Sequence, residues 1–213
     1  MKKKLLLPSI LLTHMLFYTA CGQKQYTSDI SNSQVTTASN NRSITHSSDY
    51  SSPSTQIAIT PSANGTTYQL PSLQGETITI IENGNVGFDF PQYNGKIVIF
   101  EIFGKDCEYC LEETPIINRI KREFSSRVEV VAIQAQDRMT PSVASMMLSQ
   151  QNMNYPVIEG DDAKNLLRFL SETYGWTGIL PYVLLVKNGS TEYTFPDGGV
   201  NYEELKESIE SLL

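Results

Sequence analysis

The stretch Ile97–Phe103 (IVIFEIF), continued by Gly104–Cys110 (GKDCEYC), decides how this chain of 213 residues folds. A nearly continuous apolar run of this length is typical of a buried strand, and a helix-like segment, Leu111–Phe124, follows it. A strand that leads into a helix places Cys107 at the helix N-terminus, where free backbone N–H groups and the helix dipole stabilise a thiolate. Cys110 lies one turn further on and inward, close enough to form a disulfide. The spacing predicts a redox-active dithiol in which Cys107 attacks and Cys110 resolves.

A CxxC pair also has other interpretations: a structural disulfide, half of a zinc site, or chance. A structural zinc site needs four ligands. The third cysteine and both histidines, Cys21, His14 and His46, lie in N-terminal segments that we do not expect to join the domain. We therefore predict no metal site, and no cofactor besides the Cys107–Cys110 disulfide.

The N-terminus has the pattern of an export signal. Three lysines at positions 2–4 precede an apolar stretch, Leu5–Tyr18, which is too short for a good membrane span. Tyr18-Thr19-Ala20-Cys21 resembles a bacterial lipobox, although its first residue is usually aliphatic. Residues 1–20 are therefore predicted to be a lipoprotein signal peptide and Cys21 the lipidated residue. An ordinary signal peptide cut nearby and an uncleaved anchor are the alternatives.

The charge balance excludes some partners. The chain has 16 Lys and Arg and 23 Asp and Glu. Without the three signal lysines, 13 basic residues (16 minus 3) remain against the same 23 acidic ones. Affinity for nucleic acid and for anionic membrane surfaces comes largely from Lys and Arg clusters. We expect no nucleic-acid partner, and membrane attachment through lipid.

The segment after the signal has a different composition from the rest. Residues 21–66 are rich in Ser, Thr, Asn and Gln and have no sustained apolar periodicity. Such a segment buries too little apolar surface to offset the entropy of ordering it. We predict a lipidated, disordered linker over 21–66, with a partner-binding stalk as the alternative, and a single folded domain over 67–213.

The folded part alternates between strand and helix patterns. Strand–helix–strand order around the cysteines predicts parallel pairing with a right-handed crossover, and an Asn-Gly turn predicts a hairpin near the C-terminus. The predicted strands are 77–81, 97–103, 128–135, 182–186 and 191–195, and the predicted helices are 107–124, 141–151, 163–174 and 201–213.

This order resembles the thioredoxin-like superfamily, and in particular its TlpA/ResA/DsbE-type membrane-anchored thiol-disulfide oxidoreductases. Cys110–Pro115 resembles the family's Cys-x-x-Glu-x-Pro run, and Leu180–Gly189 resembles its cis-proline strand and hairpin. The resemblance implies an α/β fold with a central mixed β-sheet flanked by helices. Asp106 stands where the family usually has tryptophan, and the loop before Pro181 is one residue longer than usual.

The resemblance also implies roles for individual residues. Pro181 would be cis and face the dithiol, and Leu180 would offer backbone hydrogen bonds to an extended substrate. Tyr109 and Trp176 are further candidates for substrate contact, with a core-packing role as the alternative for Trp176. Glu101 matches the buried acid of thioredoxin and would accept the Cys110 proton. An exposed or lysine-paired glutamate is the alternative for Glu101.

Charges beside the dithiol indicate the direction of electron flow. Asp106 and Glu108 are negative and only Lys105 opposes them. They should raise the thiol pKa and lower the reduction potential, which favours a reductase. We predict an enzyme that reduces disulfides of exported proteins. The resemblance implies substrates such as apocytochrome c and a membrane thiol electron donor.

The predicted location is the bacterial cell envelope, lipid-anchored and facing the periplasm or the outside of the cytoplasmic membrane, and we expect a monomer. Two other functions compete with the reductase: an oxidase or shuffler of exported proteins, and a non-catalytic adaptor or metal-handling lipoprotein.

Overall fold

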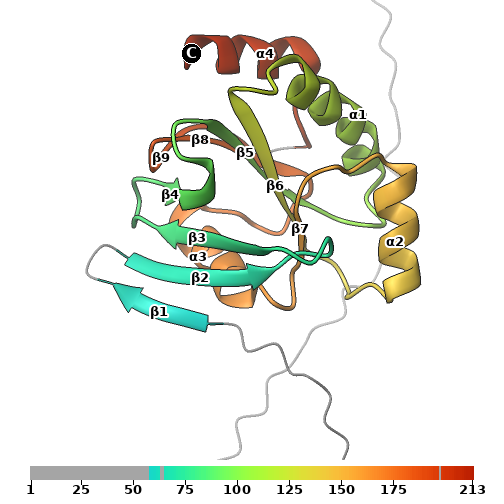
Figure 1. The fold of residues 1–213 in the computed structure, drawn as a ribbon, viewed down its shortest axis with the longest axis horizontal. Coiled ribbons are helices and arrows are strands. Elements are labelled where there is room, and N and C mark those ends of the chain that lie inside the picture. The colour runs from blue at the N-terminus through green and yellow to red at the C-terminus, as the bar shows by residue number, and fades with distance from the viewer. Residues whose placement is uncertain (1–57, 63–64, 197) are drawn as a thin grey trace, which may run out of the picture. The chain divides into compact units, whose positions relative to one another are not determined.

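The computed structural model describes residues 58–62, 65–196 and 198–213 (Figure 1). The elements, in chain order, are β1 (Ala58–Ser62), β2 (Gly65–Pro71), β3 (Thr77–Glu82), β4 (Phe88–Asp89), a short 3-10 turn (Pro91–Tyr93), β5 (Ile97–Phe103), α1 (Glu108–Glu123), β6 (Val128–Gln134), α2 (Pro141–Gln150), β7 (Val157–Glu159), α3 (Lys164–Tyr174), β8 (Tyr182–Lys187), β9 (Ser190–Phe195) and α4 (Tyr202–Ser211).

A five-stranded mixed sheet carries the dithiol. Its strand order is β7-β6-β5-β8-β9. β5 lies at its centre, parallel to β6 and antiparallel to β8. All seven residues of β5 are buried, as its apolar sequence predicts. The mixed sheet and the parallel β5–α1–β6 unit confirm the predicted fold class.

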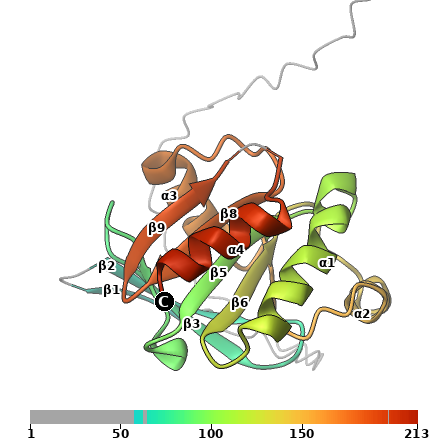
Figure 2. The same cartoon turned by 90° about the horizontal axis from the view of Figure 1, so that it is seen from above.

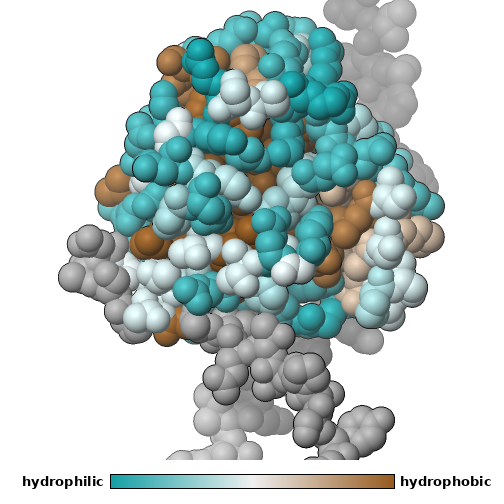
Figure 3. Space-filling view, in the orientation of Figure 1, coloured by the Kyte–Doolittle hydropathy of each residue, from teal (hydrophilic) through white to brown (hydrophobic). Residues whose placement is uncertain are grey.

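Side chains of β5 alternate between two apolar clusters, one on each face of the sheet. One cluster is formed with α1, α2 and α4, and the other with α3 and strands β2 to β4. Figure 2 shows α1 and α4 side by side over the first face. The surface seen in Figure 3 is mainly hydrophilic, with separate apolar patches. Ile97, Ile99 and Phe103 enter the first cluster, and Val98, Phe100 and Ile102 enter the second.

A second sheet, with strand order β1-β2-β3-β4, covers the second cluster. Of its strands, only β3 is predicted from the sequence pattern. The predicted disordered linker over residues 21–66 overlaps this sheet, because β1 and the first residues of β2 lie inside that range. The boundary at residue 67 is therefore placed too late. β1 and β2 pair antiparallel, so backbone hydrogen bonds hold a segment whose sequence has little apolar signal.

The hairpin β8–β9 turns at Asn188 and Gly189, both with positive φ, as the Asn-Gly pair predicts. This turn contacts the loop between β3 and β4. The Thr191 N–H donates to the Val86 carbonyl at 2.9 Å, and the Asn83 side chain donates to the Gly189 carbonyl at 3.2 Å. Gly87 lies within this contact. A Cβ atom on Gly87 would come within 2.4 Å of the Thr191 backbone nitrogen.

Gly87→Ala is therefore expected to separate the two sheets locally. We expect it to lower the free energy of unfolding by roughly 2–4 kcal/mol, because backbone atoms on both sides must move. Gly84→Ala is the matched control: Gly84 has φ +58, but a Cβ there would have no neighbour within 4 Å. Its expected cost is about 1 kcal/mol, from backbone strain alone. Urea unfolding of both variants tests this, and equal losses would contradict the steric argument.

Candidate functional site

The two cysteines form a disulfide at the start of α1. Cys107 is the N-cap of this helix and Cys110 lies in its first turn, with their Cα atoms 5.2 Å apart. The Cys110 N–H also donates to the Cys107 sulfur at 3.2 Å. Cys107 is partly exposed, whereas Cys110 is completely buried. A reagent from solution can therefore reach the first sulfur but not the second.

The sequence of α1 explains how this end of the helix is positioned. Pro115 lies inside the helix and has no N–H to donate to the carbonyl one turn before it. The Thr114 hydroxyl donates to the Cys110 carbonyl at 2.9 Å. Thr114 and Ile117 are buried, so this face of the helix packs onto the sheet and carries Cys110 inward.

The Leu180–Pro181 peptide bond is cis, as the resemblance implied. Pro181 is buried and Leu180 is partly buried, in contact with both apolar clusters. The loop between β9 and α4 lies against both this proline and α1. A Cβ atom on Gly199 would lie 3.0 Å from Pro181 Cγ and 3.1 Å from Glu113 Oε1. The proline ring and the Glu113 carboxyl therefore both lie against the same glycine, which has φ +94.

Glu101 points inward. It is fully buried, and neither carboxyl oxygen has a hydrogen-bond partner among the described residues. Its side chain lies on the same face of β5 as those of Ile99 and Phe103, which belong to the cluster that contains Cys110. Burial, followed by repulsion from Glu113, raises the pKa of Glu101 well above its usual range. The alternatives of an exposed or lysine-paired glutamate are therefore wrong.

Glu113 is a second buried carboxyl that the sequence analysis does not assign to the site. It is 3% exposed, and burial raises its pKa to about 7 although a hydrogen bond from the backbone opposes the shift. The Val200 N–H donates this bond to Glu113 Oε1 at 2.7 Å. The available signal was its position three residues after Cys110, which places both on one face of a helix. Glu101 and Glu113 are thus two buried carboxyls that act on each other, one on the strand before the dithiol and one on the helix that carries it.

The surface next to the dithiol is a groove of about 340 Å³ between α1 and the loop that precedes α4. Tyr109 lies at this groove and is 66% exposed, so it is available for contact with another protein. Trp176 is placed elsewhere. It packs against the cluster on the opposite face of the sheet, and its indole N–H donates to the Ile179 carbonyl at 2.9 Å. The core-packing alternative therefore describes Trp176 better than substrate contact.

Charged side chains surround the exposed sulfur. Lys105 forms an ion pair with Asp106, so its positive charge is already compensated. Glu108 lies in the first turn of α1, directly after Cys107. The charged neighbours of Cys107 in the chain therefore leave one negative charge uncompensated, that of Glu108.

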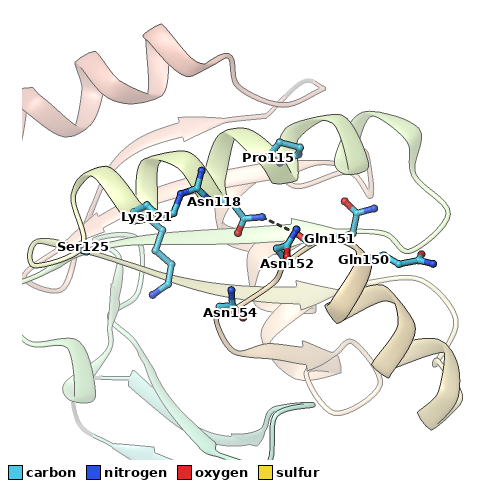
Figure 4. Close-up of a pocket in the computed structure, with 9 residues that line it drawn as sticks. Pro115, Asn118, Lys121, Ser125, Gln150, Gln151, Asn152 and Asn154 are labelled. Carbon is cyan, nitrogen blue, oxygen red and sulfur yellow. Dashed lines mark hydrogen bonds between the residues drawn. The ribbon is translucent and has the colours of Figure 1, made fainter.

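A polar pocket of about 540 Å³ lies on the other side of α1, against the end of α2 (Figure 4). Asn118 donates to the Gln151 carbonyl at 2.8 Å within it, and Lys121 is paired with Glu129 at 2.7 Å. Neither cysteine lines this pocket. The chemistry of the dithiol is therefore separate from it.

Several predicted features concern other parts of the chain. The signal peptide and Cys21 lie outside the described residues. Within the ranges that the structure describes, no helix has the length and apolar character needed to cross a membrane. No group of three or more His, Cys, Asp or Glu side chains in those same ranges is arranged to hold a metal ion.

Comparison with known proteins identifies the fold. No protein-family model and no curated protein sequence matches the chain. Among solved structures, a thiol:disulfide interchange protein of the thioredoxin family from Chlorobium tepidum is similar, with 15% identity, a TM-score of 0.54, and coverage of 73% of this chain and 97% of that one. The thioredoxin domain of a thiol-disulfide oxidoreductase from Bacteroides vulgatus gives 16% identity, a TM-score of 0.53, and coverage of 74% and 99%.

A secreted Mycobacterium tuberculosis disulfide oxidoreductase, described as homologous to E. coli DsbE, gives 15% identity and a TM-score of 0.50. It covers 67% of this chain and 94% of that one. The chain therefore has the thioredoxin-like fold, with the dithiol at the end of the central strand.

Proposed function

We propose that this protein is an extracytoplasmic thiol-disulfide oxidoreductase that reduces disulfides of exported proteins through Cys107 and Cys110. The observation that carries the proposal is the unequal exposure of two bonded sulfurs at a helix N-terminus. Only Cys107 can meet a substrate, and only Cys110 is positioned behind it to complete the exchange. The thiol-disulfide oxidoreductases among the similar structures support the same chemistry.

The reaction proceeds in two displacements. In the reduced protein the Cys107 thiolate attacks one sulfur of the substrate disulfide, and the other substrate sulfur leaves as a thiolate. Cys110 then loses its proton and attacks the Cys107 sulfur, which releases the second substrate thiolate. Two electrons pass to the substrate, and the Cys107–Cys110 disulfide seen here is the oxidised product.

Glu101 is the proposed acceptor of the Cys110 proton. It enters the same apolar cluster as Cys110 from the strand beneath it. A carboxyl whose pKa is raised towards that of a thiol accepts a thiol proton more readily than an ordinary carboxylate. Glu113 would support this role because repulsion between the two carboxylates contributes to the raised pKa of Glu101.

Substrates are expected to bind along the rim of the dithiol. The Leu180 backbone, the Pro181 ring and the exposed Tyr109 ring are the proposed contacts for a substrate, and an extended peptide bound there would place its own cysteine against the Cys107 sulfur. Exported proteins with disulfides, apocytochrome c among them, are the proposed substrates. Trp176 lies on the other face of the sheet and is not included.

The direction of electron flow is proposed from charge. Lys105 and Asp106 compensate each other in their ion pair, so the Glu108 carboxylate is the neighbouring charge that disfavours a Cys107 thiolate. A less stable thiolate makes the dithiol more reducing. We therefore favour a reductase over an oxidase.

Anchoring and location follow from the N-terminal sequence. Lipidation at Cys21 would hold the domain at the membrane surface of a bacterial cell envelope, and a membrane thiol protein would return electrons to the disulfide. The description of one similar structure as secreted supports an extracytoplasmic site. The protein is proposed to act as a monomer.

A redox titration of the full-length chain tests the proposal. The protein is equilibrated in defined thiol-disulfide buffers, free thiols are trapped, and the traps are counted by mass, with Cys21→Ser as the control that removes the third thiol. A two-electron transition near the thioredoxin value of about −270 mV supports a reductase. A value near about −120 mV would instead indicate an oxidase, and the absence of a transition would exclude exchange.

A further inference from the structure

Three buried titratable side chains meet in the apolar cluster that surrounds Cys110. Besides Glu101 and Glu113, the third is Tyr155, a residue with no role in the reaction described above. It is 3% exposed and belongs to the same cluster as Cys110. Its hydroxyl, both oxygens of Glu101 and Oε2 of Glu113 are buried without a hydrogen-bond partner among the described residues.

Strand pairing brings Tyr155 towards Glu101. Glu101 on β5 pairs with Ala132 on β6. The Ala132 N–H in turn donates to the Pro156 carbonyl at 3.0 Å. Tyr155 lies two residues before Val157, which pairs with Ala132, so Tyr155 approaches Glu101 from the neighbouring side of β6, one strand away from β5. The Tyr155 ring and the Glu101 carboxyl enter the cluster from the same face of the sheet.

The charges in this cluster require a hydrogen-bond donor. Two carboxyls in an apolar interior do not both ionise unless each negative charge is compensated. The Val200 N–H compensates Glu113, but no described group donates to Glu101. The charged side chains that act on the Tyr155 hydroxyl are those of Glu101 and Glu113.

Tyr155 is suited to be that donor. Burial, and then the charges of Glu101 and Glu113, raise the pKa of Tyr155 well above its usual range. The hydroxyl therefore keeps its proton while the carboxyls titrate. A buried hydroxyl that finds no other acceptor has most to gain from a charge that forms next to it.

We propose that Tyr155 is a positioning residue for the proton acceptor: its hydroxyl donates a hydrogen bond to the Glu101 carboxylate, directly or through one water, and so stabilises the ionised form of that carboxyl. This inference rests on the proposed function. In the resolving step, the Cys110 S–H proton moves to Glu101 and the Cys110 thiolate attacks the Cys107 sulfur. The bond between Cys107 and the substrate breaks, and the substrate sulfur leaves with the electron pair. Tyr155 keeps its own proton throughout.

Tyr155→Phe tests the proposal in the full-length protein, because phenylalanine keeps the ring and removes only the hydroxyl. The mixed disulfide between Cys107 and a model thiol is formed first and then transferred to buffers of different pH. The rate at which Cys110 releases the model thiol is measured in each buffer. Loss of the donor should raise the acceptor pKa, so the apparent pKa of release should move up by about one pH unit and the rate at pH 7 should fall about tenfold. The rate on the alkaline plateau should not change.

Tyr182→Phe is the matched control. Tyr182 is also buried, but its hydroxyl donates to the Tyr174 carbonyl at 3.1 Å in the other cluster. Its loss should leave the pH profile of thiol release unchanged. A second readout does not depend on activity: the carboxyl infrared bands of the oxidised protein should titrate at higher pH in Tyr155→Phe than in the original chain.

The outcomes separate the two proposals. If the original chain exchanges disulfides while Tyr155→Phe leaves both the pH profile and the carboxyl bands unchanged, the role of Tyr155 is wrong and the proposed function stands. If the original chain shows no exchange with any thiol, the proposed function fails. In that case the infrared titration alone still decides whether the Tyr155 hydroxyl bonds to the carboxyl pair.

Discussion

Cys110→Ser is expected to accumulate as a mixed disulfide between Cys107 and its substrates. Cys107 lies at the surface at the helix N-terminus and can still attack, but no sulfur remains behind it to release the bound partner. Turnover of a model disulfide should fall on the order of a thousandfold or more. Cys107 and Cys110 act as a unit, and loss of one member of such a unit removes most of the rate. Non-reducing gels and mass spectrometry of envelope extracts measure the adducts, which a reductant should release.

Cys107→Ser supplies the control for this experiment. It should lose turnover to the same extent and form no adduct, because Cys110 is completely buried and cannot meet a substrate. Adducts of Cys107→Ser equal to those of Cys110→Ser would assign the attack to the wrong sulfur. Because Cys21 provides a third thiol, both variants are best compared again with Cys21 replaced by serine.

Glu113→Gln is expected to stabilise the oxidised protein at neutral and alkaline pH. Burial raises the pKa of Glu113 from the ordinary 4.5 to about 7 in the folded protein. The folded chain thus holds this proton more tightly than the unfolded chain, so the stabilising contribution is complete below pH 4.5 and is lost as the pH rises to about 7. At about 1.4 kcal/mol per pH unit, the original chain loses about 3 kcal/mol over this window, and glutamine, which does not ionise, avoids the loss.

Urea unfolding at several pH values between 4 and 8 measures this effect. Glu112→Gln is the matched control: it lies on the same turn of α1 but is exposed, so its pH dependence should follow that of the original chain. The stability of Glu113→Gln should exceed that of the original chain increasingly from pH 5 upwards. A constant difference across the pH range would show that the pKa of Glu113 is the same in the folded and the unfolded chain.

The parts of the fold that the sequence predicts are those with a strong local pattern. The apolar run of β5, the helix after the cysteines and the Asn188-Gly189 hairpin each have enough signal in a few consecutive residues. The resemblance of Leu180–Gly189 to a known motif added the cis proline, which no local pattern predicts. β1 and β2 were missed because their Thr- and Pro-containing sequence shows no sustained apolar alternation and becomes a sheet only by pairing, β1 with β2 and β2 with β3.

The site shows the same division. The dithiol follows from local spacing, because Cys107 and Cys110 are three residues apart and a single helical turn fixes their relation. The surroundings of the dithiol depend on long-range packing: Glu101, Glu113, Tyr155 and Val200 come from different elements, and their approach depends on strand order and on the loop before α4. For the same reason, local sequence left both substrate contact and core packing open for Trp176, which packs against the second cluster. Spacing along one helix is a local property, whereas the burial that shifts a carboxyl pKa is produced by every layer that closes over it.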